Sequence, residues 1–251
     1  TRVAQEVMLK QERTSANLLM TALATASTGN SGTATDNLHV FRSAAANRFV
    51  LDDLNKMFTK IKRINSSFVG GTPSGARRGL TDLIVSPEIV EQIRGMAYNP
   101  ISTKGPSLTA APAAGDDSIT APEAIRQELF NSGGLPEFYG VSIMEILELG
   151  DGKKFNTIFS SVGGAATTYA AHTVAGGGTT FAQASEQVVV GLDRSRDSLI
   201  RAVAVDSDTG SEFNLQADDQ YTIRQGKIGY FGALEEGRMV LDTRALIGLI
   251  V

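Results

Sequence analysis

Residues 81–93, TDLIVSPEIVEQI, decide the fold class of this chain, because they predict a buried strand that leads directly into a helix. Leu83, Ile84 and Val85 form a short apolar run, which is typical of a strand in the core of a sheet. Ser86 can accept a hydrogen bond from a free amide at the start of the next helix. Pro87 suits the first helical position, where a missing N–H costs nothing. The stretch therefore indicates a protein that combines sheet and helix.

An amphipathic helix precedes this unit, within the tract Phe49–Met96. Its apolar stripe recurs at helical spacing and comprises Val50, Leu54, Met57, Ile61 and Ile64, widened by Leu51 and Phe58. The opposite face is charged, with acids in the first turns and bases in the last: Asp52, Asp53, Lys60, Lys62 and Arg63. Because these charges complement the helix dipole at both ends, we expect a stable helix that lies along a surface.

A glycine-rich arch, Gly70–Gly79, connects the two parts. Its glycines precede Arg77 and Arg78 and could cradle a phosphate, but the Gly-Lys-Ser/Thr ending of a P-loop is missing and no strand leads into it. We therefore predict a flexible arch. Thr25–Thr35 and Asn99–Asp117 are rich in small and polar residues and are also predicted to be exposed loops.

The remaining elements change from helical to extended along the chain. Helices are predicted over Val3–Ala26 and from the capping box at Thr120–Glu123 to Gly133. Strands are predicted from Tyr139 onward, namely Val141–Leu149, Thr157–Val162, Val188–Val190, Ala202–Val205, Met239–Leu241 and Ile247–Val251. A hairpin is predicted between Tyr221–Arg224 and Lys227–Phe231, turning at Gln225-Gly226. This order defines the α+β class.

Composition excludes several classes of function. The chain has 251 residues, 42% of them hydrophobic, and a formal net charge of -4, so it can bury a core but has no strong basic field for DNA. It contains no cysteine and only two histidines, which removes thiolate catalysis, disulfides and most metal sites. Its apolar runs are shorter than the roughly 20 residues of a membrane span. We expect a soluble protein with no cofactor, no bound metal and no membrane contact.

No catalytic centre can be built from the residues. Asp206–Glu212 resembles a calcium loop, but its glycine comes one place early and the distal acid is missing, so a turn between strands is the simpler interpretation. A small serine hydrolase using Ser142 or Asp193 with His172 remains an alternative, although the second glycine of a nucleophile elbow is missing. His39 is interpreted as a packing or surface residue. We predict that the protein is not an enzyme.

The order of the parts resembles the major capsid proteins of tailed bacteriophages, the Hong Kong 97 type fold. The similarity covers about four-fifths of the chain through weak motifs that lie at Leu51–Ile64, Leu83–Ile93, Leu135–Ile143, Val188–Asp197 with Asp193 in the acidic place, and Tyr221–Val251. In that family a long spine helix is followed by a peripheral domain and an axial domain, and the chain then returns to the peripheral domain.

The resemblance implies a domain plan and a structural role. It implies an N-terminal arm or helix with a reduced extended loop over residues 1–48, the spine helix and first peripheral part over 49–120, the axial domain over 121–205 and the return segment over 206–251. The implied function is that of a subunit of an icosahedral phage capsid, which self-assembles into hexamers and pentamers around double-stranded DNA. An encapsulin-type compartment shell shares the fold and is the nearest alternative.

Partners and contacts follow from the same resemblance. The chief partner is other copies of the chain. A scaffold or maturation protease, a portal and decoration proteins are further partners, DNA is touched only weakly and nonspecifically, and the location is the virion, assembled in the host cytoplasm. The candidate subunit contacts are the charged residues of the amphipathic helix and the arch: Asp52, Asp53, Lys56, Lys60, Lys62, Arg63, Arg77 and Arg78.

Overall fold

The computed structural model describes residues 2–28, 39–45, 47–66, 79–98, 137–138, 140–164, 168–169, 179–194, 198–205, 210, 212–218 and 229–251. The chain divides into two compact units, and each is discontinuous in sequence. Unit 1 comprises Thr1–Leu19 and Leu199–Leu241, and unit 2 comprises Met20–Ser198 and Asp242–Val251. The predicted helix from Thr120 to Gly133 lies outside the described residues.

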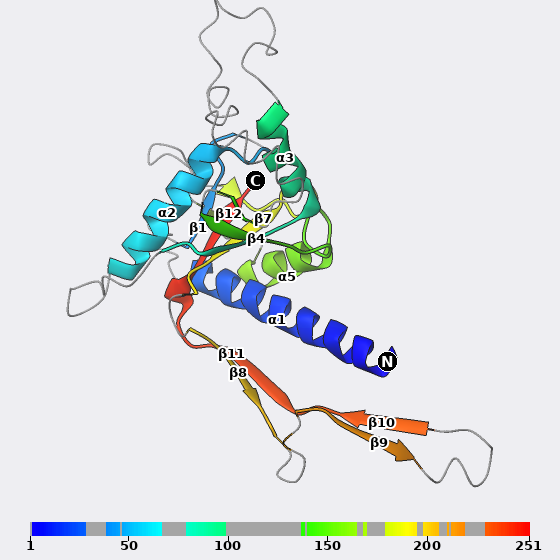
Figure 1. Ribbon diagram of the computed structural model, residues 1–251. Helices are drawn as coiled ribbons and strands as arrows, with labels where there is room; N and C mark the ends of the chain where they lie inside the picture. The colour runs from blue at the N-terminus through cyan, green and yellow to red at the C-terminus, as the bar shows by residue number, and fades with distance from the viewer. Residues whose placement is uncertain are drawn as a thin grey trace, which may run out of the picture. The chain divides into compact units, whose positions relative to one another are not determined.

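The elements alternate between helix and strand in the first half and are mostly strands in the second (Figure 1). The helices are α1 (Arg2–Thr28), α2 (Leu51–Ser66), α3 (Pro87–Tyr98), α5 (Lys154–Gly163) and the short 3-10 helix η3 (Thr243–Ala245). The strands are β1 (Val40–Arg42), β2 (Asp82–Val85), β3 (Glu137–Phe138), β4 (Val141–Glu145), β5 (Thr168–Tyr169), β6 (Thr179–Thr180), β7 (Val188–Leu192), β8 (Leu199–Val203), β9 (Asn214–Asp218), β10 (Gly229–Ala233), β11 (Glu236–Val240) and β12 (Leu246–Ile250).

A six-stranded mixed sheet forms the centre of unit 2, in the order β1-β12-β7-β2-β4-β3. β2 pairs parallel with β4 and antiparallel with β7, and β1 pairs parallel with β12. The predicted strand-to-helix unit is confirmed: β2 is buried throughout, and Pro87 is the first residue of α3. The Ser86 hydroxyl accepts a hydrogen bond from the Ile89 amide at 3.3 Å, as expected of a cap. The mixed α+β class is thereby established.

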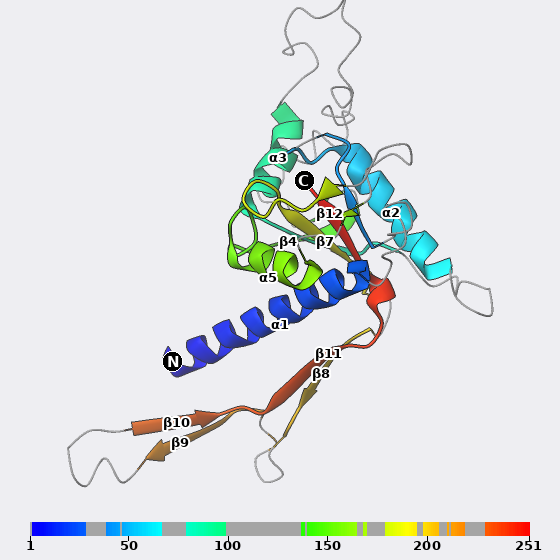
Figure 2. The ribbon, with the colours of Figure 1, turned by 180° about the vertical axis from the view of Figure 1, so that it is seen from behind.

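Both faces of the sheet are covered. On one face, the apolar stripes of α2 and α3 pack against alternate strand residues in one core cluster, which includes Leu54, Met57, Ile61, Ile89, Ile93, Leu83, Val189, Ile247 and Leu249. Gly191 in β7 permits this approach, because a Cβ there would lie 2.8 Å from Met57 Cε and 2.5 Å from Leu80 Cδ1. On the other face, Leu23 near the end of α1 packs over Gly248. Figure 2 shows the sheet from behind, between α2 and α5.

One predicted strand is wrong. Residues 157–162 belong to α5, which spans Lys154–Gly163, although their sequence is rich in residues that favour strands. Phe155 and Phe159 are four residues apart and both buried, so they form the inner face of a helix. Phe159 contacts the ring of Tyr169 at a centroid distance of 5.6 Å. A tertiary aromatic cluster therefore overrides the local preference.

β4 is also shorter than expected. It ends at Glu145, and a turn follows in which the Leu149 amide donates to the Ile146 carbonyl at 3.2 Å. The predicted strands near residues 188–190, 202–205, 239–241 and 247–251 correspond to β7, β8, β11 and β12 with shifted ends. Pattern reasoning located these strands because each carries an apolar run bounded by polar or glycine residues.

Unit 1 contains two separate two-stranded antiparallel ribbons. β8 pairs with β11, and β9 pairs with β10. The predicted hairpin is found in part: Gly229–Phe231 lies in β10, but its partner is β9, at Asn214–Asp218. Residues 219–228, which include the predicted strand Tyr221–Arg224 and its turn, lie outside the described residues.

An ion pair joins β1 to the segment before β7. The Arg42 guanidinium donates to both carboxylate oxygens of Glu186, and the second of these bonds measures 3.0 Å. The same carboxylate accepts from the Ala182 amide at 2.7 Å. The exposed fractions of the Arg42 and Glu186 side chains are only 18% and 17%, so water screens the pair weakly.

Removing the Glu186 carboxylate should therefore destabilise unit 2. We expect Glu186→Ala to lower the free energy of unfolding by about 2–4 kcal/mol, because a largely buried guanidinium loses its partner. Glu91→Ala, at an exposed position on α3, is the matched control and should change it by less than about 0.5 kcal/mol. Urea denaturation followed by circular dichroism measures both changes. Equal midpoints for the two variants would show that the ion pair between Arg42 and Glu186 does not stabilise unit 2.

Candidate subunit-contact surfaces

The start of α2 is fixed by a buried aspartate. The Asp53 carboxylate accepts hydrogen bonds from the Val50 amide at 3.0 Å, the Ala44 amide at 2.8 Å and the Ser43 hydroxyl at 2.6 Å. Asp53 is fully buried, so it holds the helix start against the preceding loop. The predicted charged face therefore excludes Asp53, because position 53 turns inward between the buried Val50 and Leu54.

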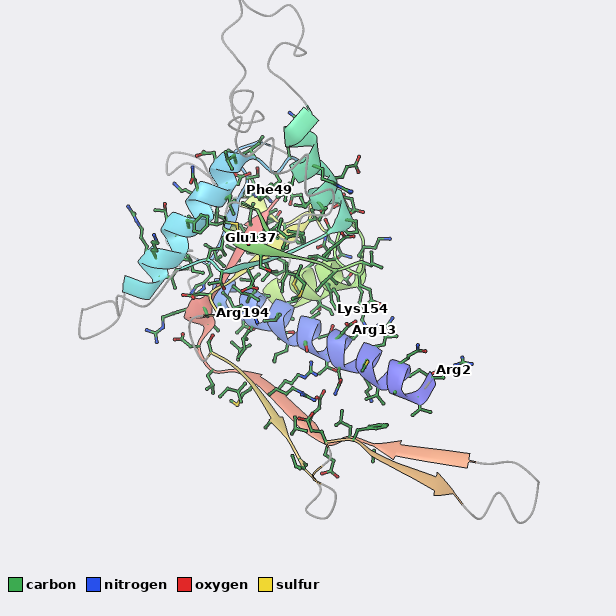
Figure 3. All side chains as sticks on the ribbon, in the orientation of Figure 1. Arg2, Arg13, Phe49, Glu137, Lys154 and Arg194 are labelled. Atoms are coloured by element: carbon green, nitrogen blue, oxygen red, sulfur yellow. The ribbon has the colours of Figure 1, made fainter. Side chains whose placement is uncertain are left out.

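The outer face of α2 retains the other predicted residues of this helix. Asp52, Lys62 and Arg63 are exposed, and Lys56 is half-buried. Figure 3 shows side chains of α2 that project away from the sheet. Arg77 and Arg78 lie outside the described residues. Whether these residues contact a neighbouring copy stays a prediction.

Lys60 lies at the margin of this face. Its Nζ lies 4.4 Å from the centroid of the Phe41 ring, over β1. Burial, and to a smaller extent the charge of Lys56 one turn earlier, lower the pKa of Lys60 from 10.5 to about 8. The cation–π contact with Phe41 offsets part of the cost of this buried charge.

The stability of the protein should therefore rise with pH in a defined window. Between pH 8 and 10.5 the unfolded chain holds a proton at Lys60 that the folded chain has released, so raising the pH favours the folded state. Lys60→Met should abolish this rise in stability between pH 8 and 10.5. It should also stabilise the protein at neutral pH, but by at most about 1 kcal/mol, because solvent screens the charge of the half-buried amine. Lys62→Met, on the exposed side, is the control. Urea midpoints measured across this window, relative to wild type, test the expectation, and identical pH profiles for both variants would contradict it.

Unit 1 carries a surface that sequence reasoning missed. A cavity of about 360 Å³ is lined by α1 and the β8–β11 ribbon: Gln11, Ser15, Leu18, Leu19, Leu199, Ile200, Arg201, Arg238 and Met239. Most of the large apolar side chains that are exposed in the described residues also belong to unit 1: Val3, Met8, Leu9, Leu199, Ile200, Val205, Met239 and Leu241. The sequence feature that could have indicated this surface is the pair of short apolar runs, 199–200 and 239–241, each next to charged residues.

A polar network ties α1 to the ribbon at this cavity. The Glu236 carboxylate accepts from Gln11 Nε2 at 3.1 Å, Arg201 Nε at 2.9 Å and Arg238 Nη2 at 3.2 Å. Arg238 Nη1 donates to the Gln11 carbonyl at 2.6 Å. Burial alone would raise the pKa of Glu236, but the hydrogen bonds from Arg201 and Arg238 outweigh it and lower that pKa. The network holds the ribbon beside α1 within unit 1.

The residues of the alternative hydrolase are not brought together in the described parts of the chain. Ser142 and Leu192 both pair with Asp82, on opposite sides of β2, so two strand spacings, roughly 9–10 Å, separate Ser142 from the strand end that Asp193 follows. Asp193 is buried, and its amide donates to the Ala245 carbonyl at 2.9 Å. His172 lies outside the described residues.

The other groups considered for chemistry also have structural environments. His39 is buried, with Nδ1 3.1 Å from the Leu246 carbonyl oxygen, and burial lowers its pKa. Of the predicted calcium loop, only Gly210 and Glu212 are described. Within the part of the chain that the structure describes, no group of three or more His, Cys, Asp or Glu side chains could hold a metal. None of the described helices is both long and apolar enough to cross a bilayer.

No protein-family model and no curated protein matches the chain. The chain is similar to a subunit in the cryo-electron microscopy structure of the holo-SrpI encapsulin complex from Synechococcus elongatus PCC 7942, with a TM-score of 0.43 and 9% sequence identity. The match covers 98% of this chain and 63% of the other.

Proposed function

We propose that this protein is a structural subunit that assembles with copies of itself into a closed shell of the Hong Kong 97 type. Unit 1 is the observation that carries the proposal. Its two ribbons each have only two strands, and such ribbons are marginal in water unless a further surface covers them. Much of the apolar surface exposed in the described residues lies on this unit. Contact with neighbouring copies would cover that surface and the open strand edges.

The path of the chain supports the proposal. The chain starts in unit 1 with α1, builds unit 2, returns to unit 1 over Leu199–Leu241 and ends in unit 2. The resemblance to the capsid family implies such a departure and return. Within the proposal, α1 with 27 residues is a better candidate for the long spine helix than α2 with 16. Unit 1 then corresponds to the peripheral domain and unit 2 to the axial domain. This division differs from the domain plan implied by the sequence resemblance, which has its boundaries at residues 49, 121 and 206.

The proposed role is structural rather than catalytic. The side chains considered for hydrolysis have packing or surface roles wherever they are described, which supports a subunit that acts through its contacts. The net charge of -4 supports a wall that does not hold nucleic acid tightly. The partners are then other copies of the chain, together with assembly factors such as a scaffold, a maturation protease, a portal or decoration proteins.

The enclosed content separates two forms of this proposal. As a phage capsid subunit, the protein would enclose double-stranded DNA and form part of a virion assembled in the host cytoplasm. As an encapsulin-type shell, it would enclose a cargo enzyme. Particles purified from the native source distinguish the two, because nuclease-protected DNA supports the capsid, whereas a second protein without DNA supports the compartment.

Sedimentation velocity tests the proposal itself. The purified chain, at concentrations raised from micromolar upward and at low and moderate salt, should shift from a 26.5 kDa species to rings or shells of many copies. A single species of monomer size under all these conditions would overturn the proposed function.

A further inference from the structure

Strand β8 of unit 1 is apolar in sequence but exposed in the structure. Residues 199–205 read LIRAVAV, and Arg201 is the one charged residue of this run. A near-continuous apolar run is typical of a central strand that is buried on both faces of a sheet. Residues 199–202 are nevertheless exposed, and Val203 is only half-buried. β8 lies beside β11 (Figure 1), and among the described strands it pairs with no other. It therefore combines the sequence of a central strand with the position of an edge strand.

The hydrogen-bond pattern of the ribbon shows which backbone groups of β8 point away from β11. The Ala204 amide donates to the carbonyl of Glu235 at 3.0 Å, and the register of the ribbon places these two residues directly opposite each other. In an antiparallel pair, such hydrogen-bonded positions alternate with positions whose N–H and C=O groups point away from the partner strand. The outward-pointing groups of β8 are therefore those of Leu199, Arg201 and Val203. We call them the outward edge of β8.

Helix α1 leaves this edge accessible. The helix is held over β11, because Gln11 bonds to both Glu236 and Arg238. Leu199 and Arg201 are on the same face of the ribbon, since they are register partners of Val240 and Arg238. Leu199 is still 39% exposed and the Arg201 side chain 41%. The β8 side of the ribbon is therefore open to a further strand.

The charges along β8 favour a second β8 as the partner strand. Arg201 Nε donates to the Glu236 carboxylate at 2.9 Å, and Arg201 Nη2 donates to Glu212 at 3.2 Å. Because these carboxylates compensate its one charge, β8 can meet an identical apolar strand without net repulsion. β11 differs, because Glu236 and Arg238 lie along its own outer edge, and charged residues on an edge oppose further pairing. The β8 edge is thus the one that suits a second copy.

We propose that β8 of one copy pairs antiparallel with β8 of a second copy about a two-fold axis. The pairing converts two marginal ribbons into one four-stranded sheet in the order β11-β8-β8-β11. β8 then becomes the central strand that its sequence indicates, and the charged β11 strands form the edges. This contact rests on the proposed function, which supplies another copy of the chain as the partner, and it names one surface through which the copies associate.

The apolar run sets the register of this pair. Ala202 is the middle residue of the run, so an axis through Ala202 pairs residues 199–205 with the same residues of the second copy. Arg201 then lies opposite Val203 of the second copy, and their outward backbone groups bond to each other. The two Ala202 residues form a close pair at the axis, with Cα atoms about 4.5 Å apart.

Two neighbouring axes are less favourable. An axis through Arg201 would place two guanidinium groups directly opposite each other, and like charges in that position destabilise a sheet. An axis through Ile200 would place the polar residues 195–197 opposite the apolar residues 203–205. The axis through Ala202 avoids both conflicts.

Disulfide cross-linking of the full 251-residue chain tests the pairing, because the chain has no cysteine of its own. Ala202→Cys should form covalent dimers in oxidised glutathione, since the two Cα atoms lie within the range of a disulfide. Gly237→Cys is the matched control. Gly237 is the register partner of Ala202, is equally exposed and has open space at its Cβ position. Its two copies would lie three strand spacings apart, roughly 14 Å. On non-reducing gels, dimers of Ala202→Cys should form at least about tenfold faster than those of Gly237→Cys.

A proline on the outward edge tests the edge itself. The Val203 N–H points away from β11, so Val203→Pro removes a donor of the outward edge without removing a hydrogen bond of the ribbon. Added to Ala202→Cys, it should lower the rate of dimer formation to that of Gly237→Cys, whereas Val203→Ala in the same background should preserve the rate. Hydrogen exchange of the β8 and β11 amides verifies that the ribbon persists. If the ribbon persists and the proline variant cross-links as fast as its parent, the proposed edge is wrong.

The outcomes separate this contact from the proposed function. Equal rates for Ala202→Cys and Gly237→Cys would overturn the pairing, and the shell function would stand if sedimentation velocity of the wild type still shows rings or shells. Rapid cross-linking of Ala202→Cys with a wild type that forms only dimers would support the pairing and overturn the shell. Slow cross-linking together with protected outward amides of β8 in assembled particles would assign the edge to another segment or protein and overturn the pairing.

Discussion

Replacing Asp53 by alanine should lower the free energy of unfolding by about 3–4 kcal/mol, among the largest effects of any single substitution in α2. The carboxylate accepts bonds from two backbone amides and one hydroxyl, all at 3.0 Å or less. Alanine would leave the buried Val50 amide without this acceptor and release α2 from the loop before it. For a chain of this size, the melting temperature should fall by roughly 6–15 °C.

Two further substitutions at the same helix start make the test specific. Asp52→Ala removes an exposed neighbouring carboxylate and should change the stability by less than about 0.5 kcal/mol. Asp53→Asn keeps one acceptor oxygen, so its loss of stability should lie between those of Asp53→Ala and Asp52→Ala. Urea denaturation followed at the helical circular dichroism band measures all three. If Asp53→Ala unfolds at the same urea concentration as Asp52→Ala, the capping role of Asp53 is wrong.

The second large effect is on assembly. Ile200 and Met239 are direct register partners on the β8–β11 ribbon, and they are 41% and 52% exposed. If neighbouring copies cover this pair, the double substitution Ile200→Glu and Met239→Lys should raise the concentration needed for assembly at least about tenfold, because charges must then be desolvated in the contact. The ribbon itself should persist, since opposite charges directly across two strands attract.

A matched apolar variant separates loss of the contact from loss of the ribbon. Ile200→Val with Met239→Leu keeps the surface apolar and should assemble at the wild-type concentration. Hydrogen exchange of the β8 and β11 amides monitors the ribbon in both variants. Light scattering that shows the charged variant assembling at the wild-type concentration would contradict a role for this face in subunit contact.

Patterns in the sequence predicted those helices and strands that depend on residues within the segment itself. The strand and helix at residues 82–98 follow from an apolar run, a serine cap and a first-position proline, and α2 follows from its helical spacing. Residues 157–162 were misassigned because the contacts that select a helix there come from Tyr169 and Phe181, outside the segment. No local pattern reports such contacts.

The candidate contact surfaces were likewise predictable only where they depend on local sequence patterns. The basic residues of α2 could be named from spacing alone, but the inward turn of Asp53 could not, because it depends on hydrogen bonds to Ser43 and Ala44 from an earlier loop. The network around Glu236 joins residues 225 positions apart in the chain, from Gln11 to the ribbon. Its existence depends on the pairing of β8 with β11, which single-sequence patterns do not specify.

Charge-detection mass spectrometry of intact particles tests the central claim most directly. If the protein is a shell subunit, particles isolated without cross-linking should have masses corresponding to many copies of the chain, in narrow populations that match closed symmetric assemblies. Electron microscopy of the same sample should show hollow shells or rings. A sample that contains only single chains or a continuous spread of aggregates, under the conditions in which the wild type is most concentrated, would contradict the account.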